Sequence, residues 1–127
     1  MALFEFRDFV GRRENVIDAL LRDWGDRVRA EYDDLLNYLA NTPMGQWSRP
    51  QTDKLHGEHR ELREFRVRVE RVRYRLYGFD GPEAGQITLV GGLRKTGGRR
   101  EERQAHDQAL GRMRAVQARD AETVDHV

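Results

Sequence analysis

The spacing of apolar residues along the chain predicts three helices. Residues 14–24 carry apolar side chains at the three- and four-residue intervals of one helical face, and residues 26–40 repeat the pattern. The second stretch ends at residues 41–43, because the proline there cannot continue a helix. Only Gly25 separates the two stretches, so we expect a helical hairpin whose apolar faces cover another layer. A third apolar stripe predicts a helix over residues 99–118.

Between the hairpin and the last helix the apolar period changes from 3.6 to 2, which predicts β-strands. Apolar and charged residues alternate over residues 62–69 and again over 72–79, and a third strand follows over 87–93. Tight turns join these strands, so we expect an antiparallel meander with one packed face and one solvent face. Residues 3–9 are expected to form a short strand or an extended entry segment. Residues 42–57, punctuated by Pro and Gly, are expected to form a loop.

These elements predict an α+β fold, in which a helical hairpin packs on a small antiparallel sheet and a C-terminal helix follows. A length of 127 residues fits one domain, which we expect to span residues 1–119, with residues 120–127 fraying as a polar tail. No apolar run approaches the roughly 18–20 residues of a membrane helix, and the first residues lack the pattern of a signal peptide. We therefore expect a soluble cytoplasmic protein that does not engage membranes.

Composition adds an uneven distribution of charge and excludes cysteine chemistry. The net charge is only +1, yet residues 63–100 carry ten basic and four acidic side chains. All but two of the 23 basic residues are arginine. Such asymmetry indicates a polyanionic partner. The chain has no cysteine, which excludes disulfides, Cys-ligated zinc and thiol nucleophiles.

The arginines concentrate on the predicted sheet. Strand periodicity places Arg66 and Arg68 on the solvent face of one strand and Arg73, Arg75 and Tyr77 on the same face of the next. Neighbouring guanidinium groups repel one another unless carboxylates or an anion bridge them. Guanidinium groups match phosphate oxygens, and an exposed tyrosine can stack on a base. The cluster therefore predicts a nucleic-acid face.

A second basic group lies where the sheet meets the last helix. Arg94 and Lys95 end the third strand, and Arg99 and Arg100 begin the helix, where backbone amides also favour an anion. The alternative for both basic groups is an ordinary solvated surface. In that case Glu64 and Glu70 would pair with the strand arginines.

The histidines offer one candidate for proton transfer. His106 belongs to the last helix, beside the sheet, and an imidazole there could act as acid or base; the alternative is an exposed helical histidine. His56 and His59 are three residues apart and could share a helical turn as metal ligands. Without cysteine and in mixed surroundings, however, we expect no metal site and no cofactor.

Three short motifs resemble the RelE/ParE toxin superfamily, most closely its HigB-like, phage-derived branch. They are LREFRV at 62–67, YRLYGF at 74–79 and LVGGLRKTGG at 89–98, and a helix follows them. The resemblance is carried by the order and spacing of the motifs and covers residues 54–118 best. It implies a RelE-like fold and a type II toxin of a toxin-antitoxin system, an mRNA interferase acting on ribosome-bound mRNA and neutralised by a cognate antitoxin. It leaves the oligomeric state open.

The same resemblance assigns roles to individual residues. Arg66 and Arg68 occupy the places of two basic residues on the strand before the YR motif, and Arg75 is the arginine of that motif. The basic residue after the last strand corresponds to Arg94 or Lys95. Some members also carry a Tyr or His near the C-terminal end.

The implied reaction needs no metal, because the ribose 2′-OH attacks its own 3′-phosphate. Arg75 and Arg94 would stabilise the charge that builds up on the phosphoryl oxygens, and Arg66 or Arg68 would orient the backbone. The last helix contains no tyrosine, so His106 is its candidate base. Two other functions remain open on this fold: a phage or prophage protein that binds a host protein or nucleic acid without catalysis, and a ParE-like inhibitor of DNA gyrase.

Overall fold

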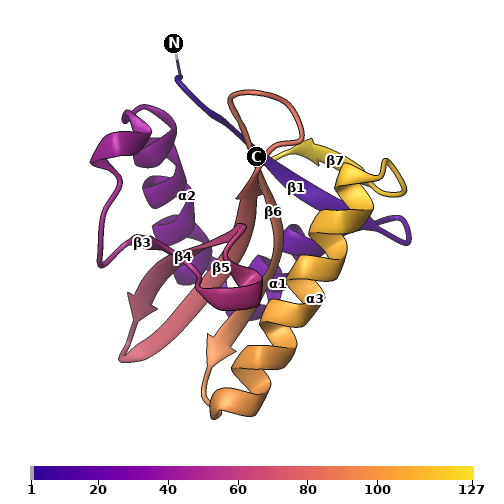
Figure 1. Cartoon of the computed structure of the whole chain (residues 1–127). Coiled ribbons are helices and arrows are strands. Elements are labelled where there is room, and N and C mark those ends of the chain that lie inside the picture. The colour runs from indigo at the N-terminus through magenta and orange to yellow at the C-terminus, as the bar shows by residue number, and fades with distance from the viewer. Residues whose placement is uncertain (1) are drawn as a thin grey trace.

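The computed structural model in Figure 1 describes residues 2–127. It contains the three predicted helices: α1 (Val16–Trp24), α2 (Asp26–Ala40) and α3 (Arg99–Gln117). Asn15 caps α1, because its side-chain oxygen accepts a hydrogen bond of 2.9 Å from the backbone N–H of Asp18. The α+β prediction and the helical hairpin before the sheet are therefore confirmed.

The predicted meander forms the centre of the sheet. Strands β4 (Leu62–Val69), β5 (Val72–Asp80) and β6 (Gln86–Lys95) pair antiparallel in sequence order. Glu70 and Arg71 connect β4 to β5 with positive φ angles of 51° and 70°, the backbone conformation of a two-residue hairpin turn. The pairing of the three strands fixes which of their side chains lie beside one another.

The complete sheet is larger than predicted and mixed, with seven strands. β1 (Glu5–Gly11) lies beside β6 and runs parallel to it, which local periodicity could not reveal. β2 (Glu14–Asn15) pairs with β1, and β3 (Thr52–Lys54) pairs with β4. The expected loop over residues 42–57 therefore contains a strand. It also holds the short 3₁₀ turn η1 (Met44–Gln46), and a second such turn, η2 (Gly57–His59), begins at its last residue.

The polar end of the chain is a strand, and the prediction that residues 120–127 fray is wrong. β7 (Glu122–Asp125) pairs antiparallel with β1. The Arg7 guanidinium donates to the backbone oxygen of Thr123 at 2.9 Å and to the Asp125 carboxylate at 2.5 Å. Polar composition hid this strand, because charged and hydroxyl groups rather than apolar packing hold it.

Helices cover both faces of the sheet, so the expected solvent face is largely buried. The α1–α2 hairpin packs on one face and α3 crosses the other (Figure 1). The core under the hairpin includes Ile17, Leu21, Tyr32, Phe65 and Leu76. The core under α3 includes Leu62, Tyr77, Phe79, Val90 and Met113. Within residues 2–127, no helix has both the length and the apolar character needed to cross a membrane.

Candidate functional site

The sheet register gathers five predicted basic residues on the face that α3 partly covers. Arg68, Arg73 and Lys95 lie opposite one another across β4, β5 and β6. Arg66 and Arg75 form a neighbouring pair one step along the same two strands. Because side chains at opposed positions share a face, the five cations form one cluster, which we call the basic face.

Arg94 does not belong to the basic face. It lies opposite Tyr74, whose ring packs in the core under the helical hairpin, so its position in the sheet assigns it to the other face. Of the two predicted residues at the end of β6, only Lys95 joins the arginines of β4 and β5. Arg99 and Arg100 are exposed in the first turn of α3 and form no ion pair within residues 2–127.

Two glutamates bridge the inner cations of the basic face. The Arg66 Nε donates to Glu64 Oε1 at 2.7 Å, and the Arg75 Nη1 lies 3.2 Å from Glu64 Oε2. The same Arg75 nitrogen lies 3.4 Å from Glu102 of α3, whose other oxygen is 3.5 Å from Lys95 Nζ. Alternating charges in the order Arg66, Glu64, Arg75, Glu102 and Lys95 offset the repulsion between cations. The pairing of Glu64 with the strand arginines, which the sequence allowed as an alternative, is therefore present.

The outer arginines remain available to a partner. Arg68 and Arg73 are exposed and have no acidic partner in the part of the chain that the structure describes. They border a groove of about 470 Å³ whose other lining includes the apolar Val67, Tyr74 and Pro50. The groove thus combines unpaired guanidinium groups with apolar surface, a combination that suits the phosphates and bases of single-stranded nucleic acid.

Tyr77 is not a stacking platform, and the prediction of its exposure is wrong. Its side chain is 0% exposed, because α3 lies across this end of β5. The ring meets His106 edge-on with centroids 4.9 Å apart, and the hydroxyl has no hydrogen-bond partner among the residues that the structure describes. Burial raises the pKa of Tyr77 well above its usual value of 10, so the phenol stays protonated.

His106 is partly buried rather than an exposed helical histidine. The centroids of its ring and the His59 ring lie 5.2 Å apart, and its Nε2 is buried with no hydrogen-bond partner in residues 2–127. Burial lowers its pKa below the usual 6.5, which keeps the imidazole neutral at pH 7. Since His106 follows Glu102 by four residues in α3, both side chains lie on the helix face toward the sheet. A neutral imidazole beside the basic face could accept a proton.

His59 has different neighbours from those that the sequence suggested. His56 is exposed, whereas His59 is buried and its Nε2 lies 2.7 Å from an Asp107 oxygen. Glu58 completes a group of three side chains whose ligand atoms lie within 4.8 Å of one another, a donor set that a divalent cation could use. The contact between His59 and Asp107 fastens η2 to α3.

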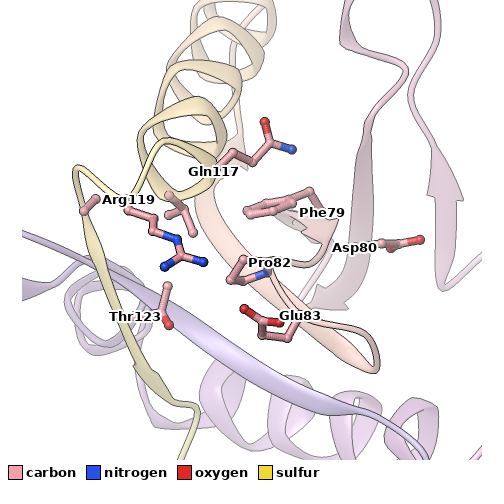
Figure 2. A pocket seen from close by; sticks show the side chains of 9 residues that line it. Phe79, Asp80, Pro82, Glu83, Gln117, Arg119 and Thr123 are labelled. Atoms are coloured by element: carbon pink, nitrogen blue, oxygen red, sulfur yellow. The ribbon is translucent and has the colours of Figure 1, made fainter.

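A separate cavity lies at the other end of α3. Figure 2 shows this space of about 340 Å³, with Arg119 reaching in from the turn after α3 and Glu83 from the β5–β6 loop. It contains none of the predicted site residues. Its lining carries both signs of charge, unlike the arginine-rich groove.

Comparison with known protein families, characterised proteins and solved structures found no match for the chain. The candidate site therefore rests on the contacts of its own residues. Sequence reasoning missed Glu102 as a partner of Arg75 and Lys95. The four-residue spacing from Glu102 to His106 was the available signal for this contact.

Proposed function

We propose that the protein is a toxin with a RelE-like fold, of the HigB-like branch, that cleaves mRNA on translating ribosomes. One observation carries the proposal: the strand register gathers Arg66, Arg68, Arg73, Arg75 and Lys95 on one face. Such a cluster suits the closely spaced phosphates of an RNA backbone. A toxin of this kind acts in the cytoplasm and is kept inactive by a cognate antitoxin.

The proposed reaction uses the 2′-OH of the RNA as its nucleophile. The 2′-oxygen bonds to the adjacent phosphorus while the bond to the 5′-oxygen breaks. The departing 5′-oxygen takes a proton from water, which leaves a 2′,3′-cyclic phosphate and a 5′-hydroxyl. Arg75 and Lys95 stabilise the negative charge of the transition state. Arg68 and Arg73 bind the flanking phosphates, and neutral His106 accepts the proton of the 2′-OH.

A second candidate function is binding of RNA or a host protein without cleavage. It is favoured by Glu64 and Glu102, which already offset the charges of Arg66, Arg75 and Lys95. On this alternative the unpaired Arg68 and Arg73 provide the attraction, and no strong cation is left for the transition state.

Inducible expression in a bacterial host tests the proposal. We expect growth arrest and mRNA cut within codons, with cutting abolished when translation is blocked beforehand. Intact mRNA together with an SOS response would indicate a gyrase inhibitor instead. RNA crosslinking without cutting would support the binding-only alternative. Unaffected growth and intact mRNA would show that the proposed toxin activity is wrong.

The double substitution Arg68→Ala/Arg73→Ala should weaken RNA binding equally for all sequences. The two guanidinium groups contact phosphates in this proposal, so the slope of log affinity against log salt should become shallower by about 1.4, roughly 0.7 per phosphate of a single strand. Fluorescence anisotropy with labelled oligonucleotides at several salt concentrations measures the slope. The charge-matched control Arg22→Ala/Arg114→Ala leaves the groove and the ion pairs of the basic face unchanged, although Arg22 pairs with Glu14 and Asp18, and it should keep the wild-type slope. Equal slopes for both double variants would mean that RNA does not bind in the groove.

His106→Ala should lower the cleavage rate and change its pH dependence. The lowered pKa of His106 places the acid limb of the wild-type rate profile below pH 6.5, because protonation there removes the base. The variant should lose that limb, and single-turnover rates between pH 5 and pH 8 measure it. An unchanged limb in the variant would assign the proton transfer to another group.

A further inference from the structure

We propose that Glu64 is a positioning residue that holds Arg66 and Arg75 at the spacing a phosphate group requires, whereas Glu102 is a counter-ion that RNA displaces. This inference rests on the proposed function and assigns different tasks to the two carboxylates of the basic face. Both touch the same nitrogen of Arg75, so their difference lies in burial and in the element that carries them.

Glu64 is built into the sheet as a fixed bridge. Its side chain is only 4% exposed, and each carboxylate oxygen meets a different guanidinium: Oε1 binds Arg66 through both Nε and Nη2, and Oε2 contacts Arg75. Its backbone oxygen also accepts a hydrogen bond of 2.9 Å from the Thr52 hydroxyl, which ties β4 to β3 at this point. A buried carboxylate is retained only with such partners. Without it, the ion pairs left to the two arginines within residues 2–127 would be the longer contacts of Arg66 to Asp53 at 3.7 Å and of Arg75 to Glu102 at 3.4 Å.

The position of Glu64 explains why an acid stands inside a phosphate-binding face. Arg66 and Arg75 lie opposite each other on paired strands, where like charges repel. Free guanidinium groups would separate and sample many rotamers, and each would have to be ordered again when RNA binds. Bonded to Glu64, both stay in place, with the remaining N–H groups of Arg75 available to an oxygen. Preorganised donors of this kind accelerate reactions more than mobile ones do.

Glu102 has none of these constraints. Its side chain is 27% exposed and comes from the first turn of α3, close to the exposed loop at Gly97 and Gly98. Its contacts to Arg75 and Lys95 are longer, at 3.4 and 3.5 Å. A phosphate oxygen can therefore replace the Glu102 carboxylate between the same two cations after a rotation of one partly exposed side chain. Replacing Glu64 would instead require a buried residue of a central strand to move.

Two matched substitutions separate these tasks, since each removes one negative charge next to Arg75. Glu102→Gln should increase the affinity for a non-cleavable 2′-O-methyl RNA about threefold and change the maximal cleavage rate much less than Glu64→Gln does. Glu64→Gln should keep or increase that affinity, because it also removes a negative charge, yet lower the maximal cleavage rate at least 30-fold. A fall in kcat without a rise in KM distinguishes positioning from a purely electrostatic effect. Equal effects of the two substitutions on cleavage would overturn the inference.

A second readout does not depend on cleavage. The Nε–H signals of Arg66 and Arg75 in an NMR spectrum should broaden or exchange faster in Glu64→Gln and stay as in wild type in Glu102→Gln. If the wild-type protein cuts no mRNA, the proposed function fails, and these signals alone decide whether Glu64 positions the arginines. Should Glu64→Gln not fold, Arg66→Lys removes the contact of two guanidinium nitrogens with Glu64 while keeping the charge, and it should lower kcat with little change in KM. Wild-type kcat in that variant would contradict the inference.

Discussion

Replacing Arg75 by alanine should lower ribosome-dependent mRNA cleavage by about 100- to 1000-fold, the usual cost of losing one preorganised donor to a transition-state oxyanion. Arg75 is the central cation of the basic face, on the middle of three strands, and contacts both Glu64 and Glu102. In an expression assay the variant should be harmless at induction levels at which the wild type arrests growth. Primer extension on a reporter mRNA gives the rate.

Arg94→Ala is the matched control for Arg75→Ala. Arg94 carries the same charge on the neighbouring strand, but its position assigns it to the opposite face of the sheet. Its removal should therefore change cleavage less than threefold. Thermal unfolding of both variants separates loss of activity from loss of fold. If Arg94→Ala abolished mRNA cleavage and Arg75→Ala did not, the active site would lie on the opposite face of the sheet.

The sequence predicted the elements whose signals are local. Helical spacing located the three helices, and alternation located β4, β5 and β6. β1 was only partly predicted, and its parallel pairing with β6 depends on residues about 80 positions apart. β3 and β7 are short and polar, so no apolar alternation marks them.

The burial of Tyr77 could have been predicted by combining the apolar stripe of α3 with the alternation of the strands. The stripe of apolar residues in α3 requires an apolar sheet face to cover, and the face under the helical hairpin was already assigned. Leu62 and Phe79 stand on the alternate positions of β4 and β5 and supply that second face with Tyr77. Because each apolar helix face needs an apolar sheet face to pack on, α3 should have been expected to cover the face that contains Tyr77.

The sequence could not have predicted that Lys95, and not Arg94, lies on the basic face. Strict alternation from Ile87 along β6 places Arg94 on the face of Arg73 and Arg75. The pairing of β5 with β6 shifts at Tyr77 and Gly78, where Val90 is the extra residue of a β-bulge. Beyond this bulge the alternation is inverted, so Lys95 joins the basic face. A single inserted register step thus decides which cation reaches the site.

His126→Ala should lower the free energy of unfolding by about 3 kcal/mol at pH 6, the lower end of the cost of leaving one member of a buried ion pair without its partner. The His126 Nδ1 lies 2.8 Å from Asp8 of β1, and its Nε2 lies 3.2 Å from Asp33 of α2. The Asp8 side chain is only 3% exposed and, among residues 2–127, would keep only its hydrogen bond from Asn15. Chemical denaturation followed by circular dichroism measures the difference.

The effect of His126→Ala should depend on pH in a defined direction. Burial alone would lower the pKa of His126, but the hydrogen bonds and charges of Asp8 and Asp33 outweigh it and raise the pKa. The stabilisation is thus complete below the unfolded value of about 6.5 and is lost as pH rises through the folded pKa. A neutral imidazole has one N–H and cannot donate to both carboxylates, so the gap between wild type and variant should narrow by pH 9. For the exposed His56→Ala variant, the free energy of unfolding should equal that of wild type at both pH values. A difference for His126→Ala that increases with pH would mean that His126 is neutral in the folded protein.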